Sequence, residues 1–144
     1  MKDLKKADRG WRLLEHTADI RLEIEGETLE GLFINAAKGF AQLVSEPRES
    51  LPTEEATVNL EAETVNDLLV DWLRELQFLN QTEGFVFLDA QDVEISGASF
   101  KARVLGRRLD SEELPPFDIK AVTYHDMSIE RTKQGYVTRI VFDI

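Results

Sequence analysis

Cysteine is missing from this chain of 144 residues. Its absence excludes disulfide bonds, thiolate zinc sites and cysteine nucleophiles. Long apolar runs are missing too, because no stretch approaches the roughly 20 apolar residues that a membrane-spanning helix needs. The first ten residues are charged and have no apolar core, so they do not resemble a signal peptide. We therefore expect a cytoplasmic protein that does not contact a membrane.

Basic residues are scarce relative to acidic ones. Seventeen Lys and Arg stand against 28 Asp and Glu, which gives a formal net charge of −11. Proteins that hold RNA or DNA by phosphate contacts need a basic surface, so we expect no direct nucleic-acid binding. The acidic balance fits a protein partner or bound cations, although it also serves solubility alone.

Several catalytic and nucleotide-binding motifs are absent as well. There is no Gly-x-x-x-x-Gly-Lys loop, no Gly-x-Gly-x-x-Gly and no serine in a nucleophile-elbow context. What remains is a chain of one domain's length with ordinary apolar content, long enough to bury a core. We predict a single domain over 1–144, with 1–10 as a flexible segment.

Hydrophobic spacing predicts the order β-α-β-α followed by several strands. The first strand is expected over 20–25, and the first helix runs from a Thr28 cap to near Ser45. The second helix lies between a 64–67 cap and Gly84. Further strands are expected over 56–62, 85–88, 93–95, 100–105, 119–125, 127–131 and 136–144, with 106–118 as the least ordered segment. Hairpin spacings favour an α+β fold of two layers, a mostly antiparallel sheet with two main helices on one face.

Acidic groups occur at both ends of the predicted fold. Asp19 leads into the first strand, and Asp143 is followed only by Ile144 with its α-carboxylate. If the first strand lies beside the last, these three carboxylates repel each other unless a cation sits between them. Oxygen ligands of this kind suit calcium, magnesium or manganese. Alternatively, Asp19 makes a local turn hydrogen bond, and backbone amides or Lys120 neutralise the last strand's end.

Four other residues are weaker candidates. Asp71 and Glu75 are four positions apart on the second helix, so they could be metal ligands or a general acid/base pair, or simply a solvated helix face. His16 could serve beside Asp19 as a proton-handling or ligand-orienting group, or pack at the core edge. His125 could act in acid/base chemistry or binding, or be an ordinary polar group at a strand end.

Five segments together resemble the archease family. They span nearly the whole chain, in family order: Glu15-His-Thr-Ala-Asp-Ile20, 29–43, Leu69-Val-Asp-Trp-Leu-Arg-Glu-Leu76, Ile119-Lys-Ala-Val-Thr-Tyr-His125 and Val141-Phe-Asp-Ile144. Each segment alone is a weak match, whereas the joint match is specific.

The resemblance implies a non-catalytic cofactor of the RtcB-type RNA ligase of tRNA splicing. Such a cofactor promotes guanylylation of the ligase and multiple turnover, and it broadens the ligase's use of nucleoside triphosphates. The resemblance also implies a divalent-metal site, usually holding calcium, at Asp19, Asp143 and Ile144. Two alternatives stay open, a stand-alone metal-dependent phosphoesterase and a chaperone-like interaction module with a structural metal.

Overall fold

The computed structural model describes residues 10–14, 19–124 and 127–144. The protein has two helices, α1 (Leu29–Val44) and α2 (Val65–Glu83), and its strands pair antiparallel. The strands are β1 (Trp11–Leu14), β2 (Asp19–Gly26), β3 (Glu54–Glu61), β4 (Phe85–Ser96), β5 (Ser99–Arg108), β6 (Ala121–Thr123), β7 (Glu130–Thr132) and β8 (Gly135–Asp143). The α+β class with two helices and antiparallel strands is therefore confirmed. No helix in these ranges is long and apolar enough to cross a bilayer.

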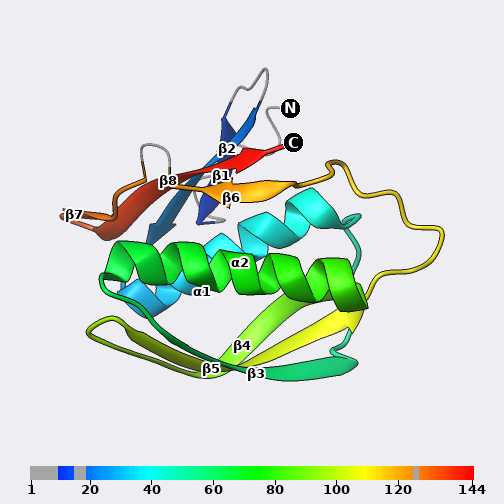
Figure 1. Ribbon diagram of the computed structural model, residues 1–144, viewed down its shortest axis with the longest axis horizontal. Helices are drawn as coiled ribbons and strands as arrows, with labels where there is room; N and C mark the ends of the chain where they lie inside the picture. Colours follow the sequence, from blue (N-terminus) through cyan, green and yellow to red (C-terminus); the bar gives the residue numbers. More distant parts are fainter. Residues whose placement is uncertain (1–9, 15–18, 125–126) are drawn as a thin grey trace.

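The strands form two sheets rather than the one sheet that the sequence predicted. One sheet has the order β1-β2-β8-β6, with β7 also paired to β8, and the other has the order β3-β5-β4. Both helices lie between the two sheets and contact each of them (Figure 1). The prediction of two layers with both helices on one face is thus wrong, because each helix is covered from two sides.

The composition of α1 explains this arrangement. Its buried residues fall on more than one side of the helix, so a single sheet does not cover them all. Towards the first sheet, a Cβ on Gly39 would come within 3.0 Å of Leu22 Cδ1, so glycine permits close approach. Towards the second sheet, the rings of Phe33 and Phe100 stack with centroids 5.5 Å apart. Trp72 of α2 packs against the Phe100 ring and donates a hydrogen bond from Nε1 to the Phe33 carbonyl at 2.9 Å.

The helix ends follow the local signals in the sequence. The Thr28 side chain accepts from the Gly31 amide at 3.0 Å, and the Thr64 side chain accepts from the Asp67 amide at 3.1 Å. Gly84 ends α2 in the left-handed conformation, with φ of 69°. These caps confirm both predicted helices.

Several strand boundaries differ from the prediction. β1 was not predicted, since four residues give too short an alternation to recognise. β4 is one continuous strand, where two strands over 85–88 and 93–95 were predicted. Its pairing with β5 contains two register shifts. β6 and β7 are only three residues each, shorter than predicted. Most of the predicted flexible segment 1–10 lies outside the described residues.

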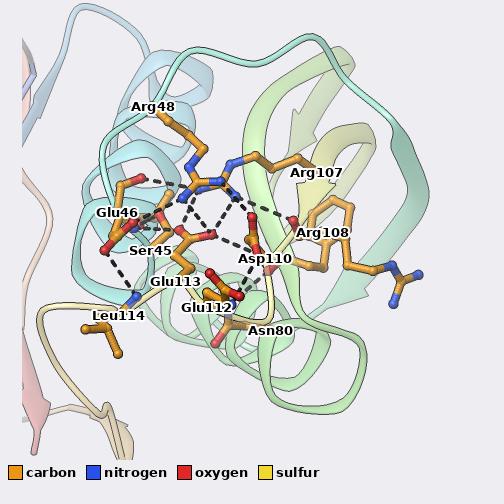
Figure 2. Close-up of polar contacts among 12 residues, drawn as sticks. Ser45, Glu46, Arg48, Asn80, Arg107, Arg108, Asp110, Glu112, Glu113 and Leu114 are labelled. Carbon is orange, nitrogen blue, oxygen red and sulfur yellow. Dashed lines mark hydrogen bonds and ion pairs between the residues drawn. The ribbon is translucent and has the colours of Figure 1, made fainter.

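The segment 106–118, predicted as the least ordered, is instead anchored by a buried ion pair. β5 continues to Arg108, and Arg107 makes a bidentate contact with Glu113, Nη1 to Oε1 at 2.9 Å and Nη2 to Oε2 at 2.7 Å. Glu113 also accepts from the backbone amides of Glu46 and Asp110 (Figure 2). The hydrogen bond from Arg107 lowers the pKa of Glu113 to about 2, against the opposing effect of burial. The pair therefore ties the segment 109–120 to the end of α1.

Candidate functional site

The predicted carboxylate site depends on β2 lying beside β8, and the two strands are neighbours. They pair antiparallel over their full length, and Asp19 is directly opposite Asp143 in the register. Directly opposed residues in such a ladder have Cα atoms about 4.5–5.5 Å apart. Two residues separated by 124 positions in the chain are thus cross-strand neighbours.

Both side chains belong to the outer face of this sheet. Their neighbours Ile20 and Phe142 are fully buried against the helices. Because successive side chains alternate across a strand, Asp19 and Asp143 project to the opposite side, away from the helices. Asp19 is half-buried and Asp143 is exposed. The site is accordingly open to solvent on one side.

The charges around this pair are only partly balanced. Arg21 Nε lies 3.5 Å from Asp19 Oδ1, and the Arg21 side chain is 44% exposed. An exposed pair of this kind contributes little, about 0–1 kcal/mol. Within the part of the chain that the structure describes, Asp143 forms no ion pair. Like charges opposed across a ladder destabilise it, so the two aspartates favour a cation between them.

Lys120 reaches this site through its backbone. Its amide donates to the Asp143 carbonyl at 2.7 Å, and the next residue, Ala121, is the register partner of Asp143. The Lys120 side chain is exposed and makes no ion pair with Asp143. Its predicted place beside the last strand is therefore confirmed, whereas charge neutralisation by its ammonium group is not seen.

Helix α2 holds the chain next to Lys120 in place. Gln77 Nε2 and Gln81 Nε2 each donate to the Ile119 carbonyl at 3.2 Å. Arg74 Nη2 donates to the Val122 carbonyl at 3.1 Å. These side chains satisfy backbone acceptors along the outer edge of the sheet, a role that the sequence pattern did not reveal. Their spacing along one helix face was the available signal, but the acceptors they meet are far away in the chain.

The remaining candidates are not brought together with the aspartate pair. Asp71 and Glu75 are half-buried on α2, and no group of three His, Asp or Glu side chains forms a metal-like cluster among the described residues. Their role as ligands or as an acid/base pair stays a prediction. His16 and His125 lie outside the described residues. The third ligand of the hypothesis, the Ile144 carboxylate, belongs to the main chain and follows Asp143 directly.

The donor set fits a hard divalent cation. All the groups concerned are carboxylate oxygens, which calcium, magnesium and manganese prefer over nitrogen or sulfur. The open outer face leaves room for water ligands, which such ions commonly retain. The chemistry of the residues present therefore agrees with the predicted metal site, and occupancy by a metal stays a prediction.

Comparison with known proteins gives one consistent family. The Archease protein family matches residues 11–144. The protein archease of Methanopyrus kandleri is 32% identical over 138 residues, which cover 93% of this chain and 99% of the relative. The protein archease of Thermococcus gammatolerans is 38% identical over 131 residues, which cover 88% of this chain and 92% of the relative.

Solved structures agree with these relatives. The solution structure of Methanobacterium thermoautotrophicum protein 1598 superposes with a TM-score of 0.81 at 26% identity, covering 94% of this chain and 99% of that one. The crystal structure of a Thermotoga maritima protein, described as an archease and possible chaperone, has a TM-score of 0.57 at 27% identity, covering 91% and 94%. The observed fold is thus similar to two independently determined structures.

Proposed function

This chain belongs to the archease family, and we propose that it is a non-catalytic activator of an RtcB-type RNA ligase. The observation that carries the proposal is the direct opposition of Asp19 and Asp143 on the open face of the sheet. In this role the protein promotes guanylylation of the ligase and multiple turnover, and it broadens nucleotide use. The protein itself joins no RNA.

In the proposed mechanism, the aspartate end of the sheet meets the ligase near its nucleotide site. Asp19, Asp143 and the Ile144 carboxylate would hold a divalent cation, most readily calcium, with magnesium and manganese as the other choices. Such a cation, when bound, would supply positive charge to neutralise phosphate oxygens. The β2–β8 ladder fixes the separation of the two aspartates, and the Lys120 amide fixes the Asp143 backbone.

The charge of the protein supports a protein partner for this mechanism. A formal net charge of −11 repels RNA but attracts a basic RNA-binding enzyme. Complementary charge mainly raises the association rate of two proteins. Salt screens these charges, so the association rate falls as the salt concentration rises. We therefore expect association with the ligase to slow as ionic strength rises.

The deciding experiment is a ligation time course with RNA substrate in excess over ligase, with and without this protein. Conversion beyond one turnover only in its presence supports the proposal, and equal conversion in its absence contradicts it. A phosphoesterase would instead release product from a phosphoester when the isolated protein is supplied with manganese or magnesium alone.

Asp19→Ala and Asp143→Ala variants test the site itself. We expect each substitution to lower divalent-metal affinity and ligase activation at least about tenfold. Even substitution of a residue that only hydrogen-bonds to a metal ligand typically lowers metal affinity or activity by that much. Glu25→Ala is the matched control, since Glu25 lies on the same strand and is exposed at the other end of the ladder. Folded aspartate variants that activate the ligase fully would refute the assignment.

The chaperone-like alternative with a structural metal has one observation in its favour. Asp19 and Asp143 belong to β2 and β8, two paired strands from opposite parts of the chain, so a cation between them also links distant parts of the chain. This alternative predicts that a chelator lowers the melting temperature while the folded fraction activates the ligase normally. The activator proposal predicts the opposite pattern, with activation lost and the melting temperature little changed.

A further inference from the structure

A groove of about 350 Å³ runs between α2 and the segment that follows the buried ion pair. One wall is the amide face of α2, and the other is a proline-rich stretch of chain. Its lining includes Gln77, Gln81, Pro115, Pro116, Phe117 and Asp118. We call this feature the α2 groove. Prolines thus line it on one side and glutamine side chains on the other.

Two large exposed apolar side chains are next in the chain to residues that line the α2 groove. Leu114 immediately precedes the prolines and is 77% exposed. Phe78 lies on α2 between the two lining glutamines and is 57% exposed. Exposed apolar residues scattered singly are ordinary, but aromatic and aliphatic groups at the rim of a groove are typical contact points for a partner.

The proline wall is held in one conformation from beneath. Glu46 Oε2 accepts from the Leu114 amide at 3.2 Å, and the Phe117 amide donates to the Leu43 carbonyl at 3.1 Å. The adjoining Arg107–Glu113 pair is almost fully buried. In Figure 2 the side chain of Leu114 points away from this network. Because these contacts already order the loop, binding of a partner would cost less conformational entropy.

The α2 groove is connected to the aspartate site through the backbone of residues 119 and 120. Ile119 lines the groove, and its carbonyl accepts from Gln77 and Gln81. The next residue, Lys120, donates its amide to the Asp143 carbonyl. The segment that forms one wall of the groove therefore leads directly to the backbone of Asp143.

The charge of the groove indicates the chemistry of its occupant. Among the described residues, Asp118 is the only charged one that lines it. The segment 109–118 carries Asp110, Glu112 and Glu113 besides Asp118, and no Lys or Arg. A second copy of this acidic chain would be repelled. A segment of a basic partner, with an apolar side chain flanked by Lys or Arg, complements both the apolar rim and the negative charge.

We propose that the α2 groove docks an apolar, Lys/Arg-flanked segment of the ligase and so holds it against the aspartate site. This inference rests on the proposed function, since it takes the partner from there. The groove supplies affinity, while Asp19 and Asp143 supply activation. Binding and activation are consequently separable by mutation.

The test measures ligase affinity by titration calorimetry and activation by ligation in the same samples. Phe78→Ser and Leu114→Ser are expected to raise the Kd about tenfold or more, as truncation of an anchor does. Leu51→Ser is the matched control, because Leu51 is 83% exposed but, unlike Phe78 and Leu114, is not next in the chain to any residue that lines the groove. Asp118→Lys should also raise the Kd and flatten its salt dependence, whereas Glu61→Lys on β3, with the same change of charge, should not.

The outcomes separate the two proposals. Unchanged ligase affinity in the groove variants overturns the docking site, even if wild-type protein activates the ligase. So does an effect of equal size in the Leu51 and Glu61 controls, or a change in self-association alone. Wild-type protein that binds through the groove without stimulating turnover overturns the activator function and leaves the docking site standing. Absence of any binding by wild-type protein overturns both.

Discussion

Replacing Glu113 by Gln removes one charge from the buried pair while nearly keeping the shape of the side chain. The Glu113 side chain is fully buried and that of Arg107 is 6% exposed. Arg107 contacts both carboxylate oxygens, and it also donates to the Glu46 carbonyl at 3.2 Å. In the variant, the guanidinium keeps its charge but loses its counter-ion in a site that excludes water.

The cost follows from the pKa of the carboxyl group. Its fall from 4.5 to about 2 corresponds to about 3 kcal/mol of differential stabilisation of the charged form. Removing one partner of a buried pair costs about 3–5 kcal/mol in other proteins, which is the same range. We therefore expect Glu113→Gln to lower the free energy of unfolding by about 3 kcal/mol at pH 7.

Acid should remove this difference. Because the pKa of Glu113 is lower in the folded state, its contribution is complete above pH 4.5 and disappears as pH falls towards 2. At pH 3 less than half of it remains. The gap in unfolding free energy between wild type and Glu113→Gln should narrow accordingly.

Urea unfolding at pH 7, 4 and 3 measures this gap directly. Glu112→Gln is the matched control, since the neighbouring Glu112 is exposed and its removal should change stability by less than about 0.5 kcal/mol. A loss below about 1 kcal/mol for Glu113→Gln at pH 7 would refute the reasoning. A gap that stays constant down to pH 3 would refute it equally.

Two further predictions concern the chain end and the core. Adding Gly-Gly after Ile144 should weaken divalent-metal binding in calorimetry, because the α-carboxylate next to Asp143 is replaced by an amide; unchanged affinity would exclude that carboxylate as a ligand. Trp72→Phe should cost roughly 1–3 kcal/mol in urea unfolding, since it removes a fully buried indole and its 2.9 Å bond to the Phe33 carbonyl; unchanged stability would show that the site repacks without loss.

The helices were predictable because their signals are local. Each N-cap hydrogen bond joins residues three positions apart, and the Gly84 terminator acts through its own backbone angles. The same holds for the hairpin of β4 and β5, whose turn lies at 97–98. Such features depend on a few neighbouring residues, so the sequence contains nearly all the information that they need.

The division into two sheets was not predictable in this way. Alternation shows that a strand is half-buried but not which sheet it joins. The deciding residues on α1 are a glycine facing Leu22 and a phenylalanine facing Phe100, contacts made across long separations in the chain. A reader of the sequence sees only that both positions are compatible with a buried helix.

The sites show the same contrast. The opposition of Asp19 and Asp143 was predicted on the condition that the first and last strands are neighbours, and that condition is met. Whether these residues and Ile144 bind a metal stays a prediction. The Arg107–Glu113 pair was missed because an Arg-Arg and a Glu-Glu dipeptide in a polar stretch resemble solvent-exposed charge. Only the end of α1, brought there by the fold, buries them.

Two carboxylates of the protein have different surroundings, and the difference bears on what a metal at the aspartates would do. Glu113, inside the molecule, is neutralised by an internal arginine, whereas Asp143 has no such partner in the described ranges. The strand pairing of β2 with β8 does not need a cation, because seven further register pairs, from Ile20–Phe142 to Gly26–Tyr136, hold it. A cation at the aspartates would thus relieve a local repulsion that involves one register pair out of eight. Because the other seven register pairs hold the strands together, we expect a cation at the aspartates to act on a bound partner rather than to stabilise the fold. Metal removal should therefore affect ligase activation more than the melting temperature.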